Sequence, residues 1–142
     1  MLFRSYTLSI QSVSNNTNTK IVFDVKEYDT ASCFSTSNYR FTPNVAGYYM
    51  FMMSIRLNSN IPSYFDTWVY KNGSQYQRLN EWYVNTGGTY PIQFHDTFAL
   101  YLNGSTDYIE MYFEGTNASG PQIGLTNFLY TNHLRGFLLR AA

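Results

Sequence analysis

The chain has little of what would cross-link a small protein or attach it to nucleic acid. Only one of its 142 residues is cysteine, Cys33, so no internal disulfide can form. Charged residues are 13% of the chain, cancel to a formal net charge of zero, and are scattered along its length. Nucleic-acid-binding proteins gather positive charge on a patch or stripe, so we predict no nucleic-acid partner. Stability has to come from packing, with assembly as the open additional source.

Long apolar runs are also missing. No segment approaches the ~20 consecutive apolar residues of a membrane-spanning helix, which predicts no membrane span. The start, Met1 to Arg4, lacks the charged residues and the apolar stretch of a secretory signal. We therefore expect that the chain is not exported by the general route.

The residues that usually carry catalysis are few and badly placed. His95, His133 and Cys33 have spacings unlike those of a zinc site. Asp96 follows His95, but adjacent strand residues point to opposite faces, so this carboxylate cannot orient the imidazole. Nothing around Cys33 suggests an activated thiol, and a small packing residue is the favoured interpretation. We predict that the protein is not an enzyme.

Asp24, Glu27 and Asp29 are the one acidic cluster in the sequence. Their oxygens could bind calcium, but the stretch lacks the dense pattern of acidic ligands that a dedicated calcium loop has. A solvated acidic edge is therefore the favoured interpretation, and we predict no cofactor, with calcium as the open alternative.

Aromatic residues are abundant, with 14 Tyr and 11 Phe making up most of the 19% aromatic content. Aromatic side chains favour pleated, half-buried surfaces. Short alternating segments separated by turn signals run along the whole chain, and no stretch has a helical period. We predict a single all-β sandwich domain over residues 1–142.

The stretch from Phe41 to Asn58 is the centre of this prediction. After a turn it alternates strictly, and one set of positions is entirely apolar: Tyr49, Phe51, Met53, Ile55 and Leu57. The opposite set begins apolar and ends polar: Tyr48, Met50, Met52, Ser54 and Arg56. A strand with a solvated face should be polar there from the start. A second layer of the chain or another subunit must therefore cover Tyr48, Met50 and Met52.

The remaining strands are predicted from the same alternation. Asn72-Gly73 supplies the positive φ angles of a tight hairpin between strands over 65–70 and 75–82. Further strands are expected over 2–10, 20–28, 92–102, 108–113 and 135–140, with a weak strand pair over 32–41. Polar or glycine-containing loops are expected over 11–19, 58–63, 85–89 and 114–124.

Spaced residues in the first half of the chain resemble the signature of the C1q-like family, the globular heads of complement C1q and its tumour-necrosis-factor-like relatives. The matching positions are Phe23, Asp29, Phe34, Phe41, Gly47, Tyr49 and Phe51. Met53 stands where the family usually has Phe or Tyr. The end of the chain resembles the family's closing strand through Gly136 and Phe137, with Leu134 in place of the usual Phe. These residues are expected to form a family-signature core.

The resemblance implies a ten-stranded jelly-roll sandwich that assembles as a compact homotrimer. In this family the sheet with the central strand packs around a threefold axis. Tyr48, Met50 and Met52 would then meet neighbouring subunits, which accounts for the second apolar face of the strand.

We expect a non-enzymatic structural module of a virus or phage particle, such as a capsid decoration, cement or fibre-tip protein. The absence of a signal peptide, of disulfides and of a collagen-like stalk favours this interpretation, as does Met1 directly before the first strand. Its partners would be other virion proteins such as the capsid shell, contacted through the loops over 11–19 and 114–124. It would be located in the virion, assembled in the host cytoplasm.

The alternative is a secreted, soluble recognition protein that binds glycans or proteins through loops at the apex of the trimer. Tyrosines outside the predicted core could stack on sugar rings or anchor protein contacts: Tyr76, Tyr83, Tyr108 and Tyr112. For any single one of them, an ordinary strand-surface position is the simpler interpretation.

Overall fold

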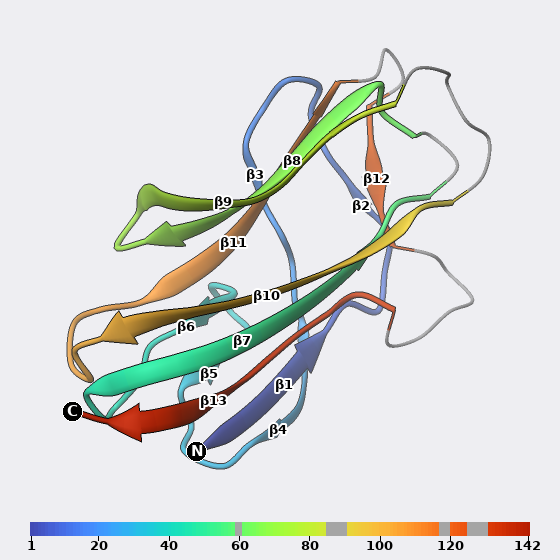
Figure 1. The fold of residues 1–142 in the computed structure, drawn as a ribbon. Coiled ribbons are helices and arrows are strands. Elements are labelled where there is room, and N and C mark those ends of the chain that lie inside the picture. Colours follow the sequence, from blue (N-terminus) through green and yellow to red (C-terminus); the bar gives the residue numbers. More distant parts are fainter. Residues whose placement is uncertain (59–60, 85–90, 117–119, 125–130) are drawn as a thin grey trace.

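The computed structural model of the chain describes residues 1–58, 61–84, 91–116, 120–124 and 131–142. Two antiparallel β-sheets pack face to face, and both termini lie at the same end of the molecule (Figure 1). The described residues contain no helix that could cross a membrane. The arrangement is a β-sandwich whose core lies between the two sheets.

Sheet A has the strand order β10-β7-β13-β1-β4. These strands are β10 (Gln93–Leu102), β7 (Gly47–Arg56), β13 (His133–Ala141), β1 (Leu2–Tyr6) and β4 (Val25–Asp29). β7 pairs with β10 along its whole length and with β13 on its other side. The stretch predicted as the organising element is thus an interior strand of this sheet.

Sheet B has the strand order β5-β6-β11-β8-β9, with β3 paired to β11. These strands are β5 (Phe34–Ser35), β6 (Arg40–Phe41), β11 (Ile109–Thr116), β8 (Tyr64–Lys71), β9 (Ser74–Tyr83) and β3 (Thr19–Lys20). A small separate pair joins β2 (Gln11–Ser12) to β12 (Gln122–Ile123). The long edge strand β9 pairs only with β8 in the described structure.

The prediction of an all-β jelly-roll sandwich is confirmed. The hairpin across Asn72-Gly73 is confirmed as β8 and β9, with positive φ angles at both turn residues. The weak strand pair before the central strand is confirmed as β5 and β6. Turn chemistry and alternation were therefore sufficient to place these elements.

Several predicted boundaries are wrong. The loops expected over 11–19 and 114–124 contain strands: β2 pairs with β12, Thr19 begins β3, and β11 continues to Thr116. These segments are short or polar, so alternation does not reveal them. The first strand ends at Tyr6 instead of residue 10, and β4 begins at Val25 instead of residue 20. The loop predicted over 85–89 lies outside the described residues.

Phe51, in the middle of β7, is fully buried and lies at the centre of an aromatic cluster. Its ring packs edge-on against Phe3 and Phe41 at centroid distances of 6.1 and 5.2 Å, and stacks on Phe98 at 5.2 Å. These partners come from β1, β6 and β10, which belong to both sheets. One ring therefore connects the two layers of the sandwich.

Two signature glycines are explained by close approaches between β7 and β13, one of them at the ring of Phe51. A Cβ on Gly47 would lie 2.3 Å from the carbonyl oxygen of Arg140, and one on Gly136 would lie 2.7 Å from the ring of Phe51. Real Cβ atoms do not approach other heavy atoms so closely. Glycine at both positions lets β13 pack tightly beside β7.

Phe51→Ala should destabilise the fold by about 3–5 kcal/mol, because it removes a fully buried aromatic side chain and leaves a cavity. Chemical denaturation followed by fluorescence measures the loss. Tyr76→Ala, at an exposed position on β9, is the control and should change stability by less than about 0.5 kcal/mol. Equal losses in the two variants would contradict the central place given to Phe51.

Candidate assembly interface

The outward face of sheet A is the surface where sequence and structure point to function. On β7 the inward residues Tyr49, Phe51 and Met53 are buried, whereas Tyr48 on the outward side is 54% exposed. Met50 and Met52 also point outward and are partly exposed. No second layer of the described chain covers them. Either a second layer of the chain or another subunit was expected to cover this face, and of these two another subunit remains.

The half of this face nearest the chain termini is apolar apart from Arg140, which is paired with Tyr48. A row of directly paired residues crosses four strands at the level of Met50: Ala99, Met50, Phe137 and Leu2. One row closer to the termini, Tyr48 and Tyr101 meet edge-on with ring centroids 5.6 Å apart. We call these six residues the apolar half. Leu2, Tyr48 and Tyr101 are among the most exposed large apolar side chains of the described chain.

Phe137 corrects a prediction. It was expected in the signature core, but it pairs with Met50, points outward and is only half-buried. Its strand neighbours Gly136 and Leu138 have the opposite parity and face inward. The other aromatic signature residues are buried in the core: Phe23, Phe34, Phe41, Tyr49 and Phe51. The signature thus contains core residues together with one residue of the outward face.

Asp29, the acidic signature position, has a local structural role. Its carboxylate accepts a hydrogen bond from the backbone N–H of Phe34 at 2.8 Å and lies 3.5 Å from the Lys26 ammonium group. Asp24 and Glu27 do not converge on it: Asp24 accepts from the backbone of Leu8, and Glu27 pairs with an arginine on β1. Within the described residues, no group of His, Cys, Asp and Glu side chains could hold a metal ion.

The other half of the outward face is cationic. At the level of Ser54 the two histidines lie on either side of it, His95 on β10 and His133 on β13. One row toward the termini, Arg135 is paired with Met52 on one side and with Arg4 on the other. We call His95, His133, Arg135, Arg4 and Arg56 the cationic half. These residues lie far apart along the chain, and only the strand register brings them together on one face.

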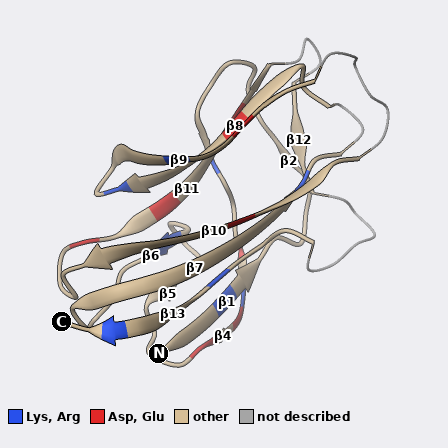
Figure 2. Cartoon of the chain, in the orientation of Figure 1, with Lys and Arg blue, Asp and Glu red and all other residues tan. Residues whose placement is uncertain are grey.

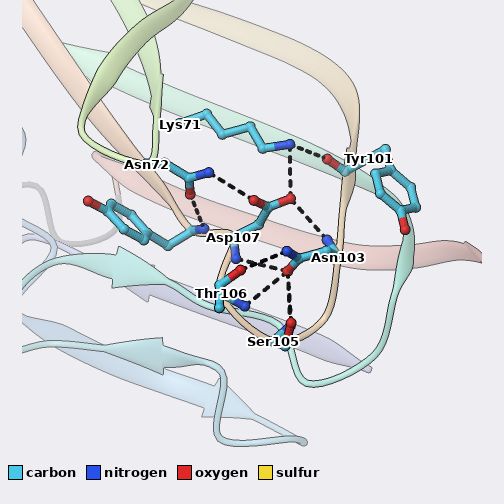
Figure 3. Close-up of polar contacts among 8 residues, drawn as sticks. Lys71, Asn72, Tyr101, Asn103, Ser105, Thr106 and Asp107 are labelled. Atoms are coloured by element: carbon cyan, nitrogen blue, oxygen red, sulfur yellow. Dashed lines mark hydrogen bonds and ion pairs between the residues drawn. The ribbon is translucent and has the colours of Figure 1, made fainter.

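A polar network fixes the end of β10 that carries Tyr101 (Figure 3). Lys71 donates to the carbonyl of Tyr101 at 3.0 Å and pairs with the Asp107 carboxylate at 3.0 Å. Asp107 also accepts from the side chain of Asn72 at 2.8 Å and from the backbone of Asn103 at 3.1 Å. The hairpin of sheet B is thereby tied to the apolar half of sheet A.

The loop after β10 is closed by one amide side chain. Asn103 Oδ1 accepts backbone hydrogen bonds from Ser105, Thr106 and Asp107 at 2.9 to 3.0 Å (Figure 3). The polar groups are directed at each other and at backbone, and a lysine neutralises the carboxylate. This arrangement supports a structural role and provides no cation site.

His95 and Asp96 lie on opposite sides of sheet A. His95 is exposed on the outward face, whereas Asp96 is buried between the sheets. Burial raises the pKa of the Asp96 carboxyl group, although Thr67 and Asn80 donate hydrogen bonds to it. Cys33 is also buried, and burial raises the pKa of its thiol. These groups form no nucleophile–base pair, and no pocket opens beside them in the described part of the chain.

The outward face of sheet B presents aromatic rings held by charged groups. Glu110 accepts hydrogen bonds from Lys20 at 2.7 Å and from Arg40 at 2.8 Å. Burial alone would raise the pKa of Glu110, but these two cations outweigh it and the pKa is lowered. The Arg40 guanidinium covers the ring of Tyr108 at 3.5 Å, and Tyr112 stacks with another tyrosine. The other two tyrosines named from the sequence also have contacts within the chain: Lys71 lies over the ring of Tyr76 at 5.8 Å, and the rings of Tyr83 and Tyr64 are 5.0 Å apart.

This architecture also occurs in solved structures of other proteins. No protein-family model and no curated protein matches the chain. It is similar to the globular domain of zebrafish complement 1qA protein, with a TM-score of 0.69, 13% identity, and coverage of 99% of this chain and 98% of that one. It is also similar to murine APRIL at pH 8.0, with a TM-score of 0.71, 10% identity, and coverage of 97% and 98%.

A third similar structure is Eiger TNF from S. frugiperda, with a TM-score of 0.67, 14% identity, and coverage of 99% of this chain and 92% of that one. At such low identities the likeness concerns the fold alone. The protein is therefore an antiparallel β-sandwich of the jelly-roll class. Within that class it has the C1q/TNF-like fold, as the signature residues predicted.

Asp107→Asn should destabilise the protein near neutral pH and much less in acid. The hydrogen bond from Asn72 is the main cause of the lowered pKa of Asp107, and Lys71 adds to it against the opposing effect of burial. A depressed pKa in the folded state contributes stability above the unfolded pKa, and that contribution disappears as the pH falls through the folded value. Melting temperatures of variant and wild type should therefore converge as the pH falls below the ordinary range of aspartate pKa values.

Asp96→Asn is the control with the opposite sign. Because the pKa of Asp96 is raised in the folded state, ionisation of this carboxyl group opposes folding at neutral pH. The asparagine variant should therefore gain stability relative to wild type near pH 7, and the gain should shrink on acidification. The assignment of these two carboxyl groups would be wrong if both variants shifted in the same direction with pH.

Proposed function

We propose that the protein is a non-enzymatic assembly module that forms a homotrimer through the outward face of sheet A. The observation that carries this proposal is the apolar half, which places aromatic, methionine and leucine side chains on the outward face of four adjacent strands. Subunit contacts are enriched in Tyr, Phe and Met and depleted in Lys and Glu. The six residues of the apolar half include no Lys, Glu or Asp, and Arg140 is the charged residue paired with Tyr48 in the same row.

The trimer itself is the assembly that the family resemblance implies. Tyr48, Met50 and Met52 lie on the face that such an assembly would cover, as predicted from the sequence. The network around Asp107 supports the proposal because it holds Tyr101 beside Tyr48 before any partner arrives. A contact surface that is already ordered loses less conformational entropy on binding.

We further propose that the trimer is a structural component of a virus or phage particle. Three properties support this placement: a low charge content, a formal net charge of zero, and stability that does not depend on disulfides. Proteins without disulfides suit assembly in a reducing cytoplasm. The contacts to other particle proteins would use the folded body, including the β2–β12 pair, which lies within the two segments predicted as contact loops.

A recognition protein for glycans or other proteins is the second candidate. The observation that favours it is the edge strand β9, where Tyr83 is 73% exposed and Trp82 and Tyr76 are about as exposed as Tyr48. Exposed aromatic rings can stack on sugars or anchor a protein partner. In this case the binding surface would include a strand edge in addition to the loops at the apex of the trimer.

Sedimentation or light scattering at micromolar concentration tests the assembly. The expected mass is three times the 16.5 kDa of the chain. Met52→Lys should dissociate the trimer, because it places an unpaired charge beside Arg135 on the covered face. Leu8→Lys, at an exposed position off the sheet, is the matched control and should remain trimeric. A wild-type monomer, or a trimeric Met52→Lys variant with unchanged melting, would rule out this face.

Mass spectrometry of purified particles tests the placement. The chain should occur in particles in copy numbers that are multiples of three. Absence from particles, combined with saturable binding of free trimers to a glycan array or a host protein, would instead support the recognition protein.

A further inference from the structure

The distribution of charge in this neutral chain is uneven. All nine acidic residues lie in the described segments, and most are paired within the chain. Six of the nine acidic residues form ion pairs, in five clusters. The clusters are Glu27 with Arg4, Asp29 with Lys26, Asp66 and Glu81 with Arg78, Asp107 with Lys71, and Glu110 with Lys20 and Arg40. Asp96 is inside the sandwich. Only Asp24 and Glu114 remain at the surface without an ion pair.

The positive charges left over are on sheet A. Arg135 and Arg140 form no ion pair with any described residue, and both are exposed on β13 (Figure 2). Figure 2 also shows basic residues on β1 and β7 of the same sheet, with acidic residues on its β4 and β10, and residues of both signs on sheet B. The face proposed to meet other subunits therefore has an excess of arginine, and the carboxylates lie mainly elsewhere.

Both arginines lie on the outward face, Arg140 beside Tyr48 and Arg135 beside Met52, but Arg135 is the one with further basic side chains around it. It lies in the row of Met52, next to the apolar half, with Arg4 directly across from it on β1. The Arg4 guanidinium is paired with Glu27, which leaves no carboxylate for Arg135. On the same face, His133 is two residues away along β13, and His95 lies about 10 Å across the sheet from His133 at the usual strand spacing.

Burying the Arg135 guanidinium in a subunit interface costs free energy unless its charge is neutralised. A buried charge without a partner destabilises an interface, and a guanidinium pairs best with the oxygens of a carboxylate or phosphate. Imidazole N–H groups are further donors for the same oxygens. Among the acidic side chains, Asp24 and Glu114 are the surface carboxylates without an ion pair that another copy could offer, and Glu114 belongs to sheet B. Asp24 of another copy is thus the side chain that would compete most directly with an oxyanion for Arg135.

We propose that the cationic half is an oxyanion-binding site that is filled when the trimer forms. The ligand class is a small, multiply charged oxyanion such as inorganic phosphate, with Arg135 as the principal ligand. This inference rests on the proposed trimer, since closing the face is what makes the charge of Arg135 unfavourable. It adds a site that the fold resemblance does not include.

Inorganic phosphate is the probe, compared with sodium chloride at equal ionic strength. Phosphate should raise the melting temperature of the wild-type trimer more than chloride does, because a ligand that binds only the native assembly stabilises it by mass action. Phosphate also stabilises proteins in general by exclusion from their surface. The site-specific part of the stabilisation is therefore the increase in melting temperature with phosphate that is lost in Arg135→Gln. The matched variant Arg140→Gln should retain that increase.

Calorimetric titration of phosphate into the trimer gives a direct second readout. Wild type and Arg140→Gln should release or take up heat with a saturable isotherm, and Arg135→Gln should not. The inference is overturned if a confirmed trimer shows no saturable phosphate binding, or if Arg135→Gln keeps the whole phosphate-specific gain.

Two further measurements separate the possible failures. The mass of each sample is determined first, so that a monomer counts against the proposed trimer and an unresponsive trimer counts against the anion site alone. Asp24→Asn is the second measurement and should behave like wild type. If it lowers the melting temperature as much as Arg135→Gln does, while phosphate has no specific effect, a carboxylate of a neighbouring copy occupies the site and the proposal is wrong.

Discussion

The packing of Phe51 against rings from both sheets is the interaction on which the rest of the structure depends. It fixes β7 inside sheet A and requires glycine at position 136, so that β13 can lie close beside it. Once the inward positions of β7 are used in this way, strand geometry sends Met50 and Met52 to the other face. The proposed interface is therefore a consequence of the core.

The fold could be predicted well from the sequence because its strongest signals are local. Strict alternation identified β7, and Asn72-Gly73 located the β8–β9 hairpin. The pairs β2–β12 and β3–β11 were missed because two-residue polar strands carry no periodic signal. Phe137 was misplaced for a different reason: a signature position says that a residue matters, but only the register with Met50 shows which face it occupies.

Only part of the candidate site could be predicted from the sequence, because the register between strands is not visible there. Tyr48, Met50 and Met52 stand on one strand, so their shared face follows from the sequence alone. The apolar row through Ala99 and Phe137 joins strands that are far apart along the chain, and so does the cationic half. The support of Tyr101 by Lys71 likewise depends on contacts between the two sheets. Such contacts become visible only when the strand order is known.

The most direct test of the central claim is the oxidation rate of individual methionines by hydrogen peroxide, read by mass spectrometry. Met53 and Met111 are buried in the core, whereas Met50 and Met52 are partly exposed on a single chain. Oxidation follows exposure, so a covered face slows the reaction. The account predicts that Met50 and Met52 react as slowly as Met53 in the assembled protein. Rates many-fold above that of Met53 in a sample with trimeric mass would contradict it.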